Sequence, residues 1–575
     1  MPRADSVRAQ RLASERRLYD PAPDGPLSVC LVYPNVYPVA MGNLGFQAVL
    51  RQLACDPRVN VDRAYLPDGP RAGWPRLLRS FERNRPLADF DILAFSVSFE
   101  TDYVHVLECL ALGGVTVRRG ARGPGEPLVM AGGAATFLNP EPLAEFVDLF
   151  LIGEAEEMLA EFVDRVGGAR RDRWTLLAEG ERVAGAYRPD RYTPVYDAAG
   201  PLSRLDYDGP GDGRVERRYL ADLDRQPTRS QILTPEAVFG DMYLVEASRG
   251  CEWGCRFCAA GFMYRPVRYR SPAVVAAGID EGLAVRPTIG LVGAEMASQP
   301  GIAALCERIV AGGGRPSPSS LKADVITRRL ATALGAGGTR SVTVAPEAGS
   351  ERLRRVINKN LTEAEILRAA EWLVGGGVDA LKLYVMVGLP TETEEDLDAI
   401  ARLVERVRGR LVANGRPTVG RIQVSINGFV PKPWTPFQWE GMEPLPRLKA
   451  KLARVRRALN AIPAVQVDTE SPREAYLQTL LSRGDRRVAP LLERVQREPT
   501  EWWAALRTLR GRGGDGVPDP DLWVHRRYDV DEALPWDFID HAVDKRYLAA
   551  EWRKALAELQ TPPCDTHTCH ACAAC

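Results

Sequence analysis

The sequence predicts an α/β protein with an N-terminal doubly wound domain, a partial (β/α)6 barrel and a mainly helical C-terminal extension. The chain has 575 residues, more than the roughly 250–300 at which a single hydrophobic core stops growing. Short apolar runs alternate with amphipathic stretches of helix length over 27–167 and again over 241–445. Such alternation is typical of parallel sheets covered by helices. From 446 to 575 amphipathic segments continue without that alternation, which indicates helices.

Two polar stretches flank the first domain. Residues 1–26 are charged and Arg-rich, and they are predicted to form a polar N-terminal tail. Residues 168–240 are rich in Arg, Asp, Gly and Pro, and they are predicted to be a connector. Within this connector, the runs AGAYRP (184–189) and YTPVYD (192–197) indicate a small β-element.

The N-terminal domain is predicted from four buried strands, at 27–34, 91–99, 127–135 and 147–157. Their apolar runs are typical of parallel strands buried on both faces. Ligands of doubly wound sheets bind at the carboxyl ends of the strands. The sequence places Asn35, Ser96, Gly132–Gly133 and Gly153–Glu154 there. Tight turns without any ligand would explain the glycines equally well.

The barrel is predicted from six strands, at 242–248, 288–295, 320–326, 341–347, 379–390 and 421–431. Helical stretches fall between them, and one starts after Thr362, a suitable N-cap, and ends in glycines. Six β/α units indicate a partial barrel rather than a complete eight-fold one. In barrels of this kind the chemistry lies at the C-terminal ends of the strands.

Charge and apolar patterning exclude several classes of protein. The 75 basic residues cancel the 75 acidic ones, so no global field attracts nucleic acid or anionic lipid. The N-terminus lacks the apolar region of a secretory signal, and no apolar run reaches the ~18 residues of a membrane span. We therefore expect a cytoplasmic protein without a membrane partner, whose thiols stay reduced. Lys does not occur before Lys322 in this Arg-rich chain.

Three of the 11 cysteines lie in one short window. Cys251, Cys255 and Cys258 are spaced C-x3-C-x2-C directly after a predicted strand. Such a loop can direct three thiolates to three corners of an iron–sulfur cube and leave one iron open. A zinc site would need a fourth ligand, which the neighbourhood lacks. Four other cysteines are isolated and are expected to be small buried hydrophobic residues: Cys30, Cys55, Cys109 and Cys306.

A second group of cysteines closes the chain. Cys564, Cys569, Cys572 and Cys575 are spaced C-x4-C-x2-C-x2-C, with two histidines between them. Four soft ligands in so few residues indicate a second metal site, either an auxiliary iron–sulfur cluster or a structural zinc. A reduced, frayed tail is the alternative.

The pattern C-x3-C-x-F-C after the first strand of a partial barrel resembles the signature of the radical S-adenosylmethionine (SAM) superfamily. The resemblance implies a 4Fe–4S cluster on Cys251, Cys255 and Cys258, whose open iron binds SAM. Reduction then yields a 5′-deoxyadenosyl radical that abstracts a substrate hydrogen.

The same resemblance assigns SAM contacts to other positions. It places Phe257 beside the adenine, Glu295 at the SAM amino group, and Glu347 at the ribose or amine. The segment GLPTETEEDL (388–397) is similar to that of the MiaB-like, tRNA-modifying branch, in which Gly388 and Pro390 would border the adenine. Lys382 is expected to meet the SAM carboxylate or the substrate, and a structural lysine is the alternative.

The order of the two domains resembles B12-binding-domain radical SAM proteins, so the first domain is expected to be cobalamin-binding-like. Domains that ligate cobalt from below carry Asp-x-His-x-x-Gly after the first strand. Here the stretch is YPNVYPVAMGNLG (33–45), without His, and His105 lies on a helical stretch elsewhere. Either cobalamin binds without a His ligand, or the fold is kept without the cofactor.

The resemblance implies a radical SAM enzyme that modifies an unidentified substrate, with RNA or a ribosomal component as the class suggested by the branch. Cobalamin-dependent methyl transfer is one alternative, and a non-catalytic iron–sulfur or zinc-binding interaction protein is another. Expected partners are a small flavodoxin- or ferredoxin-type reductant and a radical SAM-linked domain. Methylthio transfer is disfavoured because Cys30, Cys55 and Cys109 stand alone.

Overall fold

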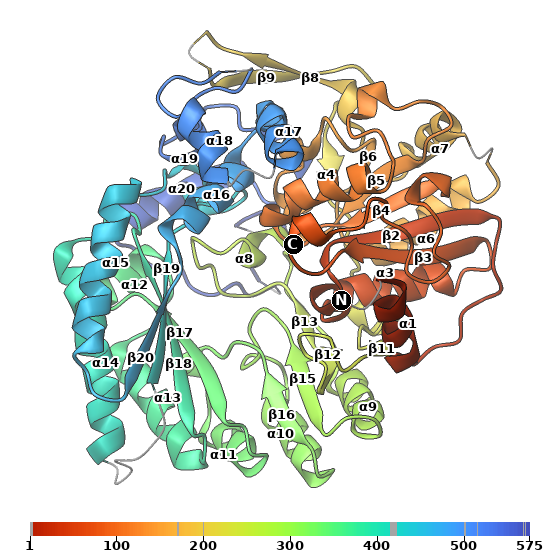
Figure 1. Ribbon diagram of the computed structural model, residues 1–575. Helices are drawn as coiled ribbons and strands as arrows, with labels where there is room; N and C mark the ends of the chain where they lie inside the picture. Colours follow the sequence, from red (N-terminus) through yellow and green to blue (C-terminus); the bar gives the residue numbers. More distant parts are fainter. Residues whose placement is uncertain are drawn as a thin grey trace.

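The structure is a computed structural model that describes residues 4–169, 172–198, 200–413, 422–498, 502–514, 516–566, 568–569 and 571–574. It is a mixed α/β protein with a helical C-terminal region, so the predicted fold class is confirmed. Figure 1 shows the N-terminal sheet and its helices on the right, the barrel strands in the lower half, and the C-terminal helices at the left and upper left. No helix among the described residues is long and apolar enough to cross a membrane.

The N-terminal sheet has the order β3-β2-β4-β5-β6-β7. Its first five strands are parallel, and the last pairs antiparallel with β6. The first strand in sequence, β2, therefore has later strands on both sides, which creates a topological switch point beside it. The strands are β2 (Leu27–Val36), β3 (Val59–Leu66), β4 (Ile92–Ser96), β5 (Leu128–Gly132), β6 (Leu149–Leu151) and β7 (Ala186–Tyr187).

Helices cover both faces of this sheet. On one face, α3 (Leu44–Ala54) and α6 (Ala155–Val166) share an apolar cluster with alternate strand residues. On the other face, α4 (Tyr103–Leu112) packs on the remaining strand residues. Both faces are thus buried, as expected for a doubly wound domain.

Strand β3 is not predicted from the sequence because charged residues interrupt its apolar run. Asp62 and Arg63 lie in the middle of this strand and are fully buried. The Arg63 guanidinium pairs with the carboxylates of Glu82 and Glu15, both at 2.6 Å. Asp62 accepts a hydrogen bond from the hydroxyl of Ser80 at 2.5 Å. Paired charges of this kind can occupy a core, and they hide a strand from a pattern search.

The second sheet region forms the partial barrel from two parallel sheets, β12-β15-β16 and β17-β18-β19-β20. A single parallel bridge between Leu321 and Val344 connects them. The strands are β12 (Met242–Glu246), β15 (Thr288–Val292), β16 (Arg315–Pro318), β17 (Ser341–Glu347), β18 (Ala380–Val387), β19 (Ile422–Gly428) and β20 (Val465–Thr469). Its helices are α9 (Pro272–Leu283), α10 (Ile302–Ala311), α11 (Arg328–Ala336), α13 (Glu363–Gly376) and α14 (Glu394–Ala413).

Two strand predictions differ from this barrel. The strand predicted at 320–326 is wrong, because β16 precedes it and only Leu321 of that segment forms a bridge. Two prolines lie in β16, and such residues occur in edge strands and disguise them. The barrel also continues past 445, because β20 pairs with β19.

The N-terminal head, the connector and the C-terminal region lie outside the two sheets described above. In the N-terminal head, α1 (Ala4–Ser14) is followed by β1 (Arg16–Arg17), which pairs with β11 (Ile232–Leu233) of the connector. The predicted β-element of the connector is present as the hairpin β8 (Tyr192–Tyr196) and β9 (Leu202–Tyr207). The C-terminal helices include α15 (Leu445–Asn460), α16 (Pro472–Arg483), α17 (Ala489–Arg497), α18 (Trp502–Leu509) and α20 (Lys545–Leu556).

Candidate active site

The three clustered cysteines lie in a loop that a short hairpin closes. After β12, strand β13 (Ser248–Arg249) pairs antiparallel with β14 (Arg268–Tyr269), and the cysteines lie between them. Gly250 starts the loop at a φ of 80°, where an added Cβ would lie 2.6 Å from the carbonyl oxygen of Tyr264. Only glycine suits this position. The sequence therefore fixes a tight loop directly after the first barrel strand.

Arg256, between the second cysteine and Phe257, anchors this loop to the rest of the chain. Its side chain is fully buried, and its guanidinium donates to the Val356 carbonyl at 2.9 Å and the Leu559 carbonyl at 2.8 Å. It also pairs with the Glu551 carboxylate at 3.0 Å. The loop is thus held by the C-terminal end of α12 (Glu351–Val356), by α20 and by the segment that follows α20.

The thiols of the loop share one buried electrostatic environment. Burial raises the pKa of Cys255 to about 11, although the nearby ammonium of Lys359 opposes this rise. Burial likewise raises the pKa of Cys258 and of Cys251, and neighbouring thiols contribute at Cys251. Such thiols stay protonated until a metal takes the place of the proton.

The loop does not form a chelate for a single ion. Among the described residues, no three His, Cys, Asp or Glu side chains are grouped so that they could hold one metal ion. A four-iron cluster makes a different demand, because each thiolate binds its own iron.

Glu347 lies beside this loop, at the end of β17. It has a φ of 65°, a strained value for a residue with a side chain. Its carboxylate lies 3.4 Å from the ammonium of Lys359. Both charges act on Cys255 and Cys258, which places the pair close to these thiols.

Phe257 and the segment after β18 also come together. Phe257 packs in one apolar cluster with Met386, Leu389 and Phe429. Leu389 lies between Gly388, which has a φ of 87°, and Pro390. The structure thus brings together the residues for which the resemblance predicts contact with adenine.

Glu295 and Lys382 have other surroundings. The carboxylate of Glu295 accepts hydrogen bonds from the backbone N–H groups of Ala297 (2.7 Å), Ser298 (2.8 Å) and Lys322 (3.0 Å). It therefore shapes the turn after β15, and its contact with SAM stays a prediction. Lys382 lies near the start of β18, with its ammonium 5.0 Å from the ring centroid of Tyr384. Its role also stays a prediction.

Two lysines near the loop, Lys359 and Lys322, were not predicted from the sequence. Lys359 is the partner of Glu347, and the ammonium of Lys322 lies 3.6 Å from the ring centroid of Trp253 within the loop. Lys322 also pairs with Asp324. Because lysine is rare in this chain, the presence of Lys322 and Lys359 in the barrel could have marked them as candidate site residues.

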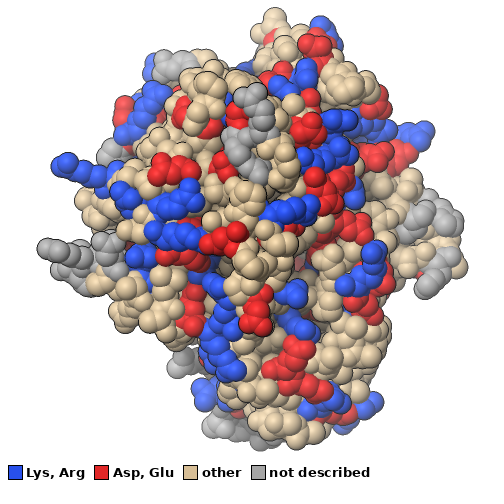
Figure 2. Space-filling model, turned by 90° about the vertical axis from the view of Figure 1, so that its right-hand side faces the viewer, with Lys and Arg blue, Asp and Glu red and all other residues tan. Residues whose placement is uncertain are grey.

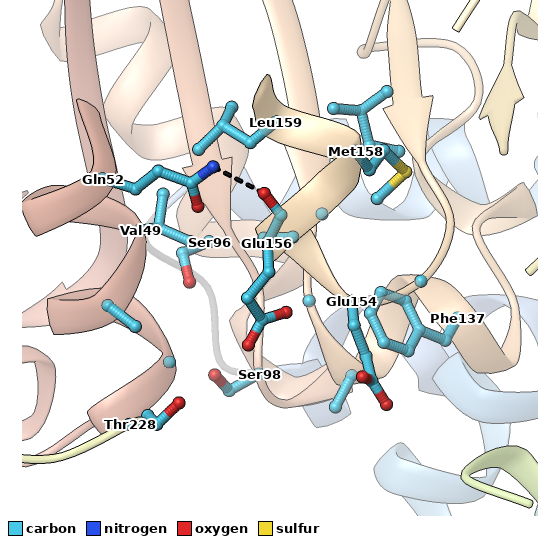
Figure 3. A pocket seen from close by; sticks show the side chains of 18 of the residues that line it. Val49, Gln52, Ser96, Ser98, Phe137, Glu154, Glu156, Met158, Leu159 and Thr228 are labelled. Carbon is cyan, nitrogen blue, oxygen red and sulfur yellow. Dashed lines mark hydrogen bonds between the residues drawn. The ribbon is translucent and has the colours of Figure 1, made fainter. Parts of the chain in front are cut away.

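A cavity of about 430 Å³ lies in the N-terminal domain, within the usual range for ligand pockets. We call it the slot. It lies between α3, α6 and one face of the sheet, and its lining includes Val29, Ile92, Met130, Val49, Leu53, Met158 and Phe162. Figure 3 shows Val49 and Gln52 facing Leu159 and Glu156 across it, and Gln52 donates to the Glu156 carbonyl at 2.7 Å.

The mouth of the slot lies at the carboxyl ends of the strands. Ser96, Gly132–Gly133 and Gly153–Glu154 line it, as the doubly wound fold predicts, whereas Asn35 donates to Asp102 at 2.8 Å and is not among the lining residues. Ser248–Gly250 and Val292–Ala294 of the barrel also line the slot. The slot therefore reaches the base of the cysteine loop.

Buried ion pairs join the two domains at this mouth. Glu154 pairs with Arg268 at 2.6 Å and with Arg249 at 2.9 Å. Arg249 also contacts Glu156 at 2.5 Å and Glu246 at 2.9 Å. Arg249 is two residues before Cys251, so the network ties the slot to the loop.

Among the described residues, no histidine lines the slot. His105, on α4, directs its Nδ1 to the Pro34 carbonyl (3.1 Å) and to Asp102 (3.2 Å).

Among the terminal cysteines, the structure describes Cys564, Cys569 and Cys572, and Cys575 lies outside the described residues.

Comparisons with known proteins agree with this architecture. The family model for the N-terminal region of radical SAM proteins matches residues 45–189, and the radical SAM superfamily model matches 245–404. An uncharacterized protein of Methanocaldococcus jannaschii is 26% identical over 494 residues, which cover 84% of this chain and 94% of the relative.

Two further relatives are more distant. A tRNA-2-methylthio-N(6)-dimethylallyladenosine synthase of Aquifex aeolicus is 28% identical over 163 residues, covering 28% of this chain and 33% of the relative. A solved structure of the cobalamin-dependent SAM radical enzyme OxsB aligns with a TM-score of 0.45 and 17% identity. The alignment covers 67% of this chain and 52% of that one, so the chain spans about half of that enzyme.

The two family models cover the N-terminal domain and the barrel that carries the cysteine loop. Within the radical SAM superfamily the members are enzymes, which sets aside the non-catalytic alternative. The chain is thus a radical SAM enzyme with a doubly wound N-terminal domain.

Proposed function

We propose that this enzyme binds a 4Fe–4S cluster on Cys251, Cys255 and Cys258 and uses it to modify a substrate through a SAM-derived radical. When bound, the cluster and SAM would supply a 5′-deoxyadenosyl radical that abstracts a hydrogen atom. The observation that carries this proposal is the closed loop after the first barrel strand, which holds Cys255 buried and Cys251 and Cys258 partly buried.

The residues around the loop fit such a group. Trp253, between the first two cysteines, has an indole N–H that is buried without a hydrogen-bond partner. The hydroxyl of Ser298, in the turn shaped by Glu295, is also buried and unpartnered. Buried polar atoms are rarely left unsatisfied, so these two groups favour a ligand at this site.

The protein would contribute burial, charge and position. The Glu347–Lys359 pair lies beside two of the thiols, where Lys359 can offset the negative charge that the thiolates acquire on metal binding. The apolar group around Phe257 would exclude water from a radical.

SAM cleavage tests the proposal. Anaerobically reconstituted, dithionite-reduced protein should convert SAM to 5′-deoxyadenosine, and Cys255→Ala should abolish the product. Cys55→Ala is the matched control, because Cys55 is far from the loop in sequence and is exposed, so the prediction that it is buried was wrong. Wild-type protein with a full cluster and no 5′-deoxyadenosine would refute the proposal.

We propose RNA or a ribosomal component as the substrate class, with a small flavodoxin- or ferredoxin-type protein as reductant. The tRNA-modifying relative from Aquifex aeolicus supports the first part. Charge gives no support, because Figure 2 shows basic and acidic side chains interspersed on the face it presents. Bulk tRNA or ribosomal RNA should raise the rate of 5′-deoxyadenosine formation severalfold, and no response to either would refute this assignment.

Cobalamin-dependent methyl transfer is the second candidate, and the slot is the observation that favours it. Its walls are apolar, its mouth carries Ser96 and Ser98, and it reaches the cysteine loop without a histidine. These residues fit a corrinoid held without a protein imidazole. Cobalt should be retained after cobalamin supplementation and lost in Ala48→Trp, which fills the slot. Arg51→Trp, on the exposed side of α3, is the control. Absence of cobalt from the wild type would refute this candidate.

A further inference from the structure

We infer that Cys564, Cys569 and Cys572 are ligands of a second iron–sulfur cluster, built directly against the loop of the first. The inference rests on the proposed function only for the neighbouring cluster, since the terminal ligands form a separate set. We call residues 561–574 the tail.

The start of the tail is bound to the cysteine loop through its backbone. The N–H of Cys564 donates to the carbonyl of Glu252 at 2.8 Å, and Glu252 directly follows Cys251. Just before it, the N–H of Thr561 donates to the side-chain oxygen of Asn358 at 2.8 Å. Asn360 returns a hydrogen bond to the Thr561 carbonyl at 2.7 Å. The tail therefore lies across the residue after Cys251 and the segment that follows α12.

The other end of the tail is buried against the same loop. Cys572 is 1% exposed, and its carbonyl accepts a hydrogen bond from the N–H of Asp544 at 3.0 Å. The guanidinium of Arg265, which follows α8 (Ala260–Met263) in the cysteine loop, lies 5.4 Å from the ring centroid of Tyr547 and close to the Cys572 thiol. This contact places the Cys572 side chain against the cysteine loop.

The tail has no regular secondary structure among its described residues. Ordering such a segment is unfavourable, at about 1–2 kcal/mol per residue in backbone entropy. A metal cross-link between its cysteines would supply the missing stabilisation. Cys564 and Cys569 are partly exposed, which leaves a path for cluster assembly.

The spacing selects iron–sulfur over zinc. The run C-x4-C-x2-C matches the spacing of plant-type ferredoxin sites, and C-x2-C-x2-C matches bacterial ones. Structural zinc sites instead use two ligand pairs separated by a longer stretch. The fourth cysteine of the spacing, Cys575, lies outside the described residues.

Metal analysis of two variants separates the clusters. The tail variant carries Cys→Ser at 564, 569 and 572, the loop variant carries Cys→Ser at 251, 255 and 258, and Cys55→Ser is the control. After anaerobic reconstitution, the tail variant should lose roughly a third to a half of the wild-type iron and sulfide. The loop variant should keep that share. The electron paramagnetic resonance spectrum of reduced wild type should differ from the sum of the two variants, because adjacent paramagnetic clusters interact.

Unchanged iron in the tail variant, or zinc in place of iron, would overturn the inference. Unchanged iron in the loop variant would instead overturn the proposed function, so the two failures are distinct. Cys569→Ser guards against misfolding, because this partly exposed residue keeps its backbone bond to the Asp565 carbonyl at 2.8 Å. It should lose the same iron on reconstitution, and its melting temperature should equal that of wild type when both proteins are stripped of metal.

Discussion

Glu154→Gln should weaken the junction between the two domains. The carboxylate of Glu154 accepts two hydrogen bonds from Arg268 (2.6 and 2.9 Å), one from Arg249 (2.9 Å) and one from the N–H of Leu220 (2.9 Å). Breaking a buried ion pair costs about 3–5 kcal/mol. Arg249 keeps Glu156 and Glu246, whereas Glu154 is the carboxylate paired with Arg268. We therefore expect Glu154→Gln to lower the free energy of unfolding by about 3 kcal/mol, the low end of this range.

A thermal melt under anaerobic conditions measures this loss. For a unit of 150–250 residues, about 3 kcal/mol corresponds to a melting temperature lower by roughly 6–12 °C. Burial raises the pKa of Glu154, but Arg268 and Arg249 outweigh it and lower the value below the usual 4.5. The stabilisation is therefore present above pH 4.5 and is lost as the pH falls through the lowered pKa, so variant and wild type should converge in acid. Asp280→Asn, in an exposed pair with Arg308, is the control and should melt as wild type does. A Glu154→Gln variant that also melts as wild type does would refute the reasoning.

Three further predictions concern buried groups. Burial lowers the pKa of His541 to about 3 from 6.5. The unfolded chain alone binds a proton between these values, so the free energy of unfolding should fall by about 1.4 kcal/mol per pH unit from pH 6 to 4. Urea titrations at several pH values should show that the free energy of unfolding falls less steeply with pH in His541→Gln than in wild type. Equal slopes for the two proteins would contradict this. Gly349→Ala should destabilise by about 1–3 kcal/mol, because its Cβ would lie 2.2 Å from the Ile400 nitrogen. Gly375→Ala, with open space inside α13, should instead stabilise by about 0.5–1 kcal/mol, and equal melting temperatures would be inconsistent with both. Arg256→Lys should lower the iron bound by the loop at least severalfold, because one ammonium cannot replace the fork that reaches Val356, Leu559 and Glu551. Arg546→Lys, a change at an exposed position, is the control and should keep its iron. If iron analysis finds that Arg256→Lys keeps its iron as well, the prediction is contradicted.

The cysteine loop was predictable from sequence because its chemistry lies in local spacing. Cys251, Cys255 and Cys258 lie within one short loop, and Gly250, with its positive φ, marks where that loop starts. The alternation of strands and helices was equally visible in most of the barrel. By contrast, β3 was hidden by the buried charges of Asp62 and Arg63, whose partners come from other segments of the chain.

The contacts of the tail and of Glu295 could not be predicted. The bond between Cys564 and Glu252 joins backbone atoms, which leave no trace in residue type. Glu295 resembles a ligand in sequence, but its carboxylate is occupied by N–H groups of the turn. Sequence shows which groups are available for chemistry, whereas long-range packing decides which of them the fold already uses.

The pairing of β1 with β11 has a consequence for how the chain is made. Arg16 and Arg17 leave the ribosome more than two hundred residues before their partners Leu233 and Ile232. Domains generally fold in the order of synthesis. Here β1 has no strand partner until the connector emerges. Translation speed across that interval should therefore affect how much nascent protein reaches the native state.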